Sequence, residues 1–390
     1  MGAKTWLAGN AVRVGGHMVG EKIRRPLART ISDVPRDGMA LTTEWLTATL
    51  CRDHPGAEVV GFSSPGGSVG TSTRMALRVE YNDTGTAAGL PTQLFTKTSA
   101  SLTQRLLLGA AHVLDGETDF FMKLRPHVDM EAPLGYWGAY DPASWRSIAI
   151  MEDIAVTRGA QFITATTPVT RDQVFDLVGT LAVMHGTFWE HDAIRGLKTP
   201  RDHLHNVGSL IDMAARAKVG MERSKAVVPT SLLGQADRLW RGTQTSLELA
   251  TSSEAATLIH GDCHVGQTYI TGDGRMGLAD WQVVQQGCWA NDFSYLVGSA
   301  LEPADRRAWE HELLETYLEQ LEAAGGKAPS FDDAWTTYRQ QLFYPYSAWA
   351  FTIGRAFYQP KMQLDEVSLK IVHRLATAID DLDAFDAIGV

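Results

Sequence analysis

Two aspartates stand 18 positions apart on either side of a segment that resembles a β-hairpin, Asp262 before it and Asp280 at its far end. Residues 268–271 and 276–280 have the patterns of two short strands. The Gly272-Asp-Gly274 turn between them supplies the backbone freedom that a tight hairpin needs. Because a hairpin folds its two ends together, we expect the two carboxylates to converge on one site.

Two convergent carboxylates suit phosphoryl transfer. One of them can accept the proton of an attacking hydroxyl or align it, while the other holds Mg²⁺, which prefers hard oxygen ligands. In this interpretation Asp262 is the catalytic base and Asp280 is a metal ligand. A hydrolase that uses the same pair on a phosphate ester is the weaker alternative.

The segments around these aspartates resemble the signature of a known family. His260-Gly-Asp-Cys-His-Val-Gly-Gln267 and Asp280-Trp-Gln282 are similar to His-Gly-Asp-x-His-x-x-Asn and Asp-Trp/Phe-Gln of the aminoglycoside phosphotransferase and choline/ecdysteroid-kinase-like group. The resemblance covers about residues 40–360. It implies a bilobal protein-kinase-like α+β fold with a small antiparallel-sheet N-lobe and a larger, mainly helical C-lobe. It also implies ATP and Mg²⁺ as cofactors.

One residue departs from the family pattern. Gln267 stands where the family has a metal-binding Asn, and its side chain is one methylene longer. We expect Gln267 to supply an amide oxygen to the metal beside Asp280. The alternative is a nucleotide-binding, pseudokinase-like module without turnover.

A glycine-rich segment, residues 63–72, lies between the strand patterns of residues 59–62 and 75–81. Its glycines let backbone amides approach an anion, and no Lys follows as in a Walker A loop. In the resemblance this segment is the flap over the nucleotide phosphates. The residues assigned to nucleotide binding here are Gly66, Gly67, Ser68, Gly70 and Thr71.

The resemblance also assigns a Lys–Glu pair and a hinge. Lys97, in the strand pattern of residues 93–98, is expected to hold the α- and β-phosphates, and Glu117, at the start of a helical stretch, to orient it. Residues 150–154 resemble the strand-to-hinge segment that contacts adenine. The hinge residues assigned to nucleotide binding are Met151, Glu152 and Ile154.

The secondary-structure pattern changes along the chain. Residues 38–153 read as a sheet-rich, nucleotide-binding lobe, and residues 154–390 as a helix-rich lobe that carries the catalytic residues and the acceptor site. Residues 1–37 read as a partly disordered leader. Helices in the second part are expected near residues 172–190, 203–219, 229–250, 292–301, 304–323, 331–358 and 364–386.

Composition restricts the function further. The formal net charge of −10 over 390 residues argues against nucleic acid as a partner. Three scattered cysteines and no long apolar run favour a cytoplasmic protein without a membrane span. Residues 1–30 hold six Lys and Arg against one Glu, which suits a solvated leader or a strap over the acidic body, or binding to a membrane surface or partner.

The expected activity is transfer of the ATP γ-phosphate to a hydroxyl of a small molecule. The acceptor is expected to be aminoglycoside-, macrolide- or amino-alcohol-like. Residues 338–358 are dense in aromatic side chains, which are typical of a helical core. Two polar members, Tyr344 and Tyr346, are alternatives for contact with the acceptor.

Overall fold

The computed structural model describes residues 3–253, 255–357 and 361–390, and the chain forms two compact units. The first comprises Met1–His127 and Pro133–Ala160, and the second comprises Val128–Ala132 and Gln161–Val390. The boundary therefore falls after residue 160, whereas the sequence suggests 153. Side-chain contacts explain the difference, because Glu152 pairs with Arg158 at 2.5 Å within the first unit.

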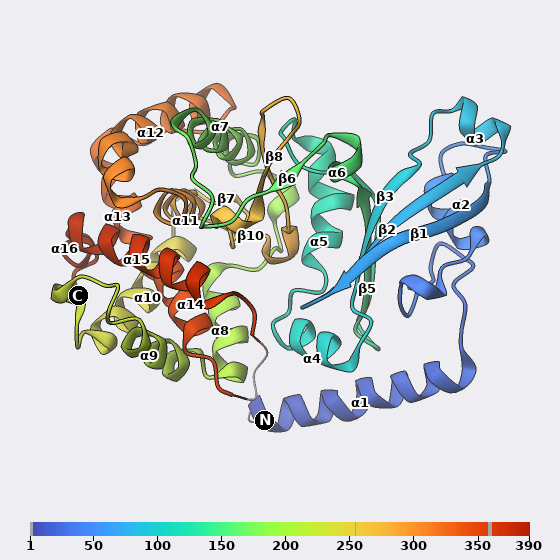
Figure 1. Ribbon diagram of the computed structural model, residues 1–390, viewed down its shortest axis with the longest axis horizontal. Helices are drawn as coiled ribbons and strands as arrows, with labels where there is room; N and C mark the ends of the chain where they lie inside the picture. Colours follow the sequence, from blue (N-terminus) through green and yellow to red (C-terminus); the bar gives the residue numbers. More distant parts are fainter. Residues whose placement is uncertain (1–2, 254, 358–360) are drawn as a thin grey trace. The chain divides into compact units, whose positions relative to one another are not determined.

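The first unit is built on an antiparallel five-stranded sheet in the order β1-β2-β3-β5-β4 (Figure 1). Alternating side chains of β2, Leu77, Val79 and Tyr81, are buried in the same hydrophobic cluster as Trp45 and Leu46 of helix α2. Strand β3 lies in the middle of the sheet. The strands are β1 (Val59–Val69), β2 (Thr73–Tyr81), β3 (Gln93–Thr98), β4 (Gly135–Asp141) and β5 (Arg146–Glu152).

Local signals set the ends of the helices in this unit. Helix α4 begins with a capping box in which Ser101 and Gln104 satisfy each other's backbone amides. The spacing of apolar residues over 103–124 suggests one helix, but the chain leaves helical geometry after α4 and returns to it at α5. The helices after the leader are α2 (Thr43–Leu50), α3 (Asp83–Ala87), α4 (Leu102–Ala110), α5 (Gly116–Asp119) and α6 (Ile154–Thr157).

The sequence suggests a partly disordered leader, whereas residues Ala3–Arg24 form one long helix, α1. Val14 is completely buried, and the ring of Trp6 stacks on that of His112 with centroids 5.6 Å apart. Beyond the helix, Ala28 and Val34 join the hydrophobic cluster of the first unit. Residues 3–37 thus pack as part of the first unit.

The second unit is mainly helical. Several expected helices are divided in two: residues 203–219 span α8 and α9, and residues 331–357 span α13 and α14, because Asp212 and the 341–342 turn interrupt them. Residue 358, the expected end of the last of these, lies outside the described residues. The helices are α7 (Arg171–Thr187), α8 (Pro200–Ile211), α9 (Met213–Arg223), α10 (Ala236–Thr251), α11 (Ala290–Ala300), α12 (Pro303–Ala323), α13 (Phe331–Gln340), α14 (Phe343–Ile353), α15 (Asp365–Asp381) and α16 (Ala384–Ile388).

Helices α9 and α14 pack unusually closely. A Cβ placed on Gly220 would lie 1.7 Å from the carbonyl oxygen of Ala350, and one on Gly354 would lie 1.8 Å from that of Arg216. Only glycine fits at these two positions. Among the described residues, no helix is long and apolar enough to cross a bilayer.

Short strands frame the motif segments of the second unit. The hairpin expected between the two aspartates is present as β8 (Thr268–Ile270) and β9 (Met276–Leu278), and β6 (Gln161–Phe162) extends it to three strands. A separate pair, β7 (Thr257–Ile259) and β10 (Gln285–Gly287), precedes and follows the two segments. The sequence pattern predicts only the two hairpin strands, because β6, β7 and β10 are too short to show the alternation of apolar and polar residues that marks a strand.

Candidate active site

The second unit brings the two motif segments together at the base of the hairpin. The backbone amide of Ala279 donates to the carbonyl of Gln267 at 2.8 Å. The ring Nε2 of His260 lies 2.9 Å from the carbonyl oxygen of Ala279. These contacts join the segment that carries Asp262 to the one that carries Asp280, as the hairpin predicts.

Asp262 lies on a loop that directly follows β7. The hydroxyl of Tyr295 donates to its Oδ1 at 3.0 Å, and the amide nitrogen of Gln267 donates to its Oδ2 at 3.2 Å. The side chain of Asp262 is 35% exposed. Its carboxylate is therefore fixed by two donors and still open to solvent.

The loop itself is braced from beneath by Asp292 on α11. The completely buried carboxylate of Asp292 accepts the backbone amide of His260, at 2.5 Å, and that of Gly261, at 2.9 Å. Gly261 has φ +78°, and a Cβ there would lie 2.4 Å from the carbonyl oxygen of Val283. Asp292 thus holds the loop through direct hydrogen bonds, and the turn before Asp262 requires glycine.

Burial and charge together raise the pKa of Asp262 to about 6. Partial withdrawal of the carboxylate from water is the largest cause of the rise, and the negative charge of Asp280 reinforces it. The hydrogen bonds from Tyr295 and Gln267 lower the pKa. A carboxylate with a raised pKa is a better proton acceptor, which suits a general base.

Asp280 takes up a backbone conformation that is uncommon for a residue with a side chain. Its φ and ψ are both 66°, in the left-handed region. Asp tolerates this region better than most residues. Backbone strain of this kind tends to collect at functional sites.

The side chains of Asp280 and Gln267 offer the kinds of oxygen ligand that Mg²⁺ prefers. The hydrogen bond from the Gln267 amide nitrogen to Asp262 identifies the nitrogen end of that side chain, so the amide oxygen is the end available to a metal. A carboxylate and an amide oxygen are hard ligands, and Mg²⁺ usually completes its shell with water and substrate phosphates. No group of three or more His, Cys, Asp or Glu arranged for a metal occurs in the described part of the chain.

The two histidines of the motif are engaged in packing. His264 accepts the backbone amide of Gly266 at 2.9 Å, and its ring meets that of Trp349 edge-on at 5.0 Å. Burial lowers the pKa of His264 to about 3, so its ring is neutral. In the aromatic segment, Tyr344 and Tyr346 belong to the core, since they are only 7% and 1% exposed, whereas Phe357 is 95% exposed.

In the first unit, the expected Lys–Glu contact is present. Lys97 Nζ lies 3.2 Å from Glu117 Oε1, and both side chains are buried. Lys97 is held on the central strand β3, opposite Arg74 of β2 and Ala149 of β5. An ammonium fixed in this way is a directed positive charge rather than a freely moving one.

The glycine-rich segment differs from the expected loop. Gly66, Gly67 and Ser68 continue strand β1 and pair with β2, after a register shift between Ser63 and Gly66, and only residues 70–72 form the turn. Gly67 is required by the pairing, because a Cβ there would lie 2.4 Å from the carbonyl oxygen of Arg74. Gly70 is exposed and Thr71 half-buried at the tip. The segment is a strand–turn–strand flap.

The hinge residues follow β5. Met151 is buried and pairs with Phe95 of β3 and Gly135 of β4. The carboxylate of Glu152 accepts from Thr157 at 2.6 Å and from Arg158 at 2.5 Å, and Ile154 begins α6. The Glu152 side chain is therefore used internally, and its backbone amide donates to the carbonyl of Leu134 at 2.9 Å.

Tyr295 is the site residue that the sequence does not indicate. It lies in the middle of α11, 33 positions after Asp262, where a Tyr reads as an ordinary core residue. Its hydroxyl is buried, and desolvation raises the pKa of Tyr295 well above its ordinary value, so that it remains a donor. The one feature of the sequence that points to Tyr295 is its position one helical turn after Asp292.

Comparison with solved structures finds kinases and phosphotransferases of small molecules. Choline kinase LicA from Streptococcus pneumoniae has 11% identity and a TM-score of 0.43, covering 83% of this chain and 94% of that one. The microcompartment-associated aminopropanol kinase has 15% identity and a TM-score of 0.44, covering 87% and 96%. Spectinomycin phosphotransferase APH(9)-Ia, in complex with ADP and spectinomycin, has 13% identity and a TM-score of 0.44, covering 86% and 97%. No curated protein matches the chain.

The family assignment rests on the sequence itself. Residues 96–341 match the phosphotransferase enzyme family, a span that takes in Lys97, Glu117, Asp262 and Asp280. The antiparallel-sheet unit followed by the helical unit is the α+β arrangement of a protein-kinase-like fold. This chain belongs to the phosphotransferase enzyme family.

Proposed function

We propose that this protein transfers the γ-phosphate of ATP to a hydroxyl of a small molecule, with Mg²⁺ as the metal. The observation that carries the proposal is the carboxylate of Asp262, held by Tyr295 and Gln267, with its pKa raised to about 6. A fixed, partly exposed base of this kind suits alignment of an acceptor hydroxyl. Family membership supports the reaction class.

In the second unit, Asp262 accepts the acceptor's proton while Tyr295 and Gln267 keep its carboxylate in one orientation. Because phosphoryl transfer passes through a loose transition state, positioning and charge supply most of the catalysis. Asp280 and the amide oxygen of Gln267 would hold Mg²⁺. When bound, the ion neutralises phosphate charge.

In the first unit, Lys97 provides the fixed positive charge for the nucleotide phosphates, and Glu117 prevents it from swinging away. The flap residues Gly66, Gly67, Ser68, Gly70 and Thr71 are assigned to the nucleotide phosphates. The base of the nucleotide is assigned to the segment that carries Met151, Glu152 and Ile154.

The test is an acceptor screen followed by one substitution. Purified protein with ATP and Mg²⁺ is incubated with aminoglycosides, macrolides, amino alcohols and sugars, and ADP release is measured. With the acceptor found, Asp262→Asn is expected to lower kcat by about 10²–10⁴-fold. Its ATP affinity should stay within about twofold, because the base contributes to the transition state rather than to nucleotide binding.

Asp273→Asn is the matched control. Asp273 lies at the exposed tip of the same hairpin, where its partners are Thr271 and Arg275, so kcat should not change. Full activity in Asp262→Asn would remove this residue from the role of base. Binding of ATP with no transfer to any acceptor would instead support a nucleotide-binding module, with Gln267 as the reason.

A further inference from the structure

A cavity of about 890 Å³ lies within the first unit, apart from the flap and the Lys97–Glu117 pair. Its walls are α1, the segment that follows α1 to residue 36, and the end of the β4–β5 hairpin. Nothing assigned to nucleotide binding lines it. The family motifs do not account for this cavity.

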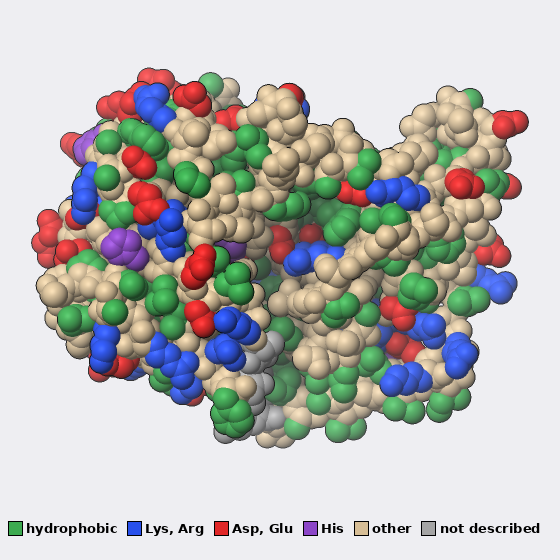
Figure 2. Space-filling model, in the orientation of Figure 1, with side chains coloured by type: hydrophobic (Ala, Val, Ile, Leu, Met, Phe, Trp, Pro, Cys, Tyr) green, Lys and Arg blue, Asp and Glu red, His purple; other side chains and the backbone are tan. Residues whose placement is uncertain are grey.

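Basic side chains outnumber acidic ones in its lining. Arg13, Arg24, Arg36 and Arg146 line it, together with His17. Figure 2 shows Lys and Arg side chains gathered on the surface around the C-terminal end of α1. The cavity is therefore set in the basic part of an otherwise acidic chain.

The acidic side chains of the lining are already satisfied by the protein. Glu21 accepts two hydrogen bonds from Arg105, at 2.9 and 2.8 Å. Asp33 accepts the backbone amides of Arg29 and Thr30 at 2.9 and 2.8 Å, which lower its pKa. The main partner of Glu21, Arg105, does not line the cavity, although Glu21 Oε1 also lies 3.7 Å from Arg146 Nε.

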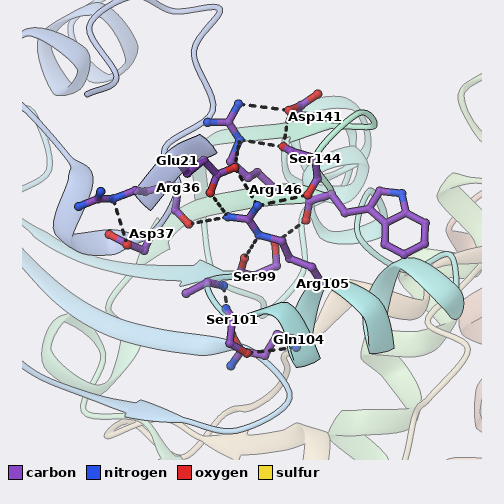
Figure 3. Close-up of polar contacts among 12 residues, drawn as sticks. Glu21, Arg36, Asp37, Ser99, Ser101, Gln104, Arg105, Asp141, Ser144 and Arg146 are labelled. Carbon is purple, nitrogen blue, oxygen red and sulfur yellow. Dashed lines mark hydrogen bonds and ion pairs between the residues drawn. The ribbon is translucent and has the colours of Figure 1, made fainter. Parts of the chain in front are cut away.

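Asp141 is also used internally, since it accepts from Ser144 and, at 3.2 Å, from Arg146. Arg146 is bound through Nε and one Nη, so its second Nη is the part left for another acceptor. Figure 3 shows Arg36 joined to Asp37, and Arg146 joined both to Asp141 and to Glu21 of the Glu21–Arg105 pair.

Arg24 and Arg36 have guanidinium N–H groups for which the described residues supply no hydrogen-bond acceptor. Arg24 is exposed on the last turn of α1, and within the described ranges no hydrogen bond or ion pair holds its guanidinium. Arg36 Nε lies 3.3 Å from Asp37 Oδ2, yet this buried nitrogen makes no hydrogen bond to any described residue. A planar guanidinium with unused N–H groups matches the oxygens of a phosphate group.

We infer that this cavity binds a small oxyanion with two or more negative charges, of the phosphate-ester or pyrophosphate class, through Arg24, Arg36 and Arg146. The oxyanion can belong to a free metabolite or to a lipid headgroup. Val12, which lines the cavity, Val19 and Ile23 are 78%, 58% and 78% exposed on α1, a surface that suits the lipid source. Both sources present the same chemistry to the three arginines.

The experiment is isothermal titration of the full chain with inorganic pyrophosphate, without Mg²⁺ and with EDTA present. Saturable binding is expected, and Arg24→Ala and Arg36→Ala should each raise Kd roughly tenfold, since each removes a charge-assisted hydrogen bond. Arg29→Ala is the matched control, because Arg29 is an exposed neighbour that does not line the cavity. Lys97→Ala controls for binding at the nucleotide phosphates.

A second arm distinguishes the sources of the anion. Flotation with vesicles of phosphatidylcholine, with or without phosphatidic acid, should recover the protein on the acidic vesicles only if a lipid supplies the phosphate. Arg24→Ala should then abolish recovery, whereas a free metabolite as the source predicts pyrophosphate binding without flotation.

Three outcomes would overturn the inference. One is the absence of both saturable pyrophosphate binding and flotation. Another is an equal loss in Arg29→Ala, which would indicate non-specific charge attraction. The third is a loss confined to Lys97→Ala, which would place all of the binding at the nucleotide site.

Discussion

The carboxylate of Glu21 and the guanidinium of Arg105 form a two-bond ion pair across 84 positions of sequence, at 2.9 and 2.8 Å. Arg105 is completely buried. Its other N–H groups donate to the backbone carbonyls of Ser99, Ser144 and Arg36 at 3.1, 3.3 and 3.3 Å (Figure 3). Every donor of Arg105 thus has an acceptor, and one side chain joins α1, α4 and the β4–β5 hairpin.

Glu21→Gln should destabilise the protein by about 3 kcal/mol, because it leaves a buried guanidinium without its compensating charge. Urea denaturation of the first unit's transition measures the loss. Glu58→Gln, a change at an exposed position, should alter stability by less than about 0.5 kcal/mol. Equal stability of the two variants would contradict the assigned role of Glu21.

Tyr295→Phe should lower kcat about fivefold while leaving the KM for ATP unchanged. The substitution removes one hydrogen bond to Asp262, worth about 1 kcal/mol, and keeps the ring in place. Steady-state kinetics with the acceptor found in the screen provide the measurement. Tyr344→Phe is the control, since the Tyr344 ring packs edge-on to Tyr295 at 6.4 Å. A matching loss in the control would indicate disturbed packing instead.

Lys97→Met should weaken ATP binding by at least about tenfold, since it removes a charge-assisted contact with phosphate. The flexible methionine fills most of the space of the buried lysine. Titration calorimetry with ATP measures the affinity, and thermal denaturation checks the fold. Lys123→Met, at a position 67% exposed on its side chain, should bind ATP as the wild type does. Unchanged affinity in Lys97→Met would exclude Lys97 from the phosphate site.

Gly220→Ala should destabilise the protein by about 3 kcal/mol, because its Cβ would collide with the carbonyl oxygen of Ala350. Gly208→Ala, in α8, is the opposite case, since the nearest atom to its Cβ would be 3.9 Å away. Removing a helical glycine there should stabilise by about 0.5–1 kcal/mol. Chemical denaturation of both variants tests the sign as well as the size, and two changes of the same sign would contradict the packing of α9 on α14.

The sequence predicts site residues best where the residues of a motif are close together in the chain. The segment around Asp262, the hairpin and Lys97 are all recognisable, because motif residues and turn glycines lie close together in the chain. Tyr295 is not, since its role depends on how α11 packs against the loop. Helix α1 is missed because Gly9, Gly15, Gly16 and Gly20 lower its intrinsic propensity, and tertiary contacts at Val14 and Glu21 outweigh that cost.

The ion pair of Glu21 has a practical consequence for anyone who shortens this chain. A basic, glycine-rich beginning invites removal before expression or crystallisation. Deleting residues 1–37 would take away the Glu21 carboxylate and the Arg36 carbonyl, and with them most of what neutralises and solvates Arg105. It would also strip Ala28 and Val34 from the hydrophobic cluster. A trimmed protein of this kind should be prone to aggregation, and its inactivity would say nothing about catalysis.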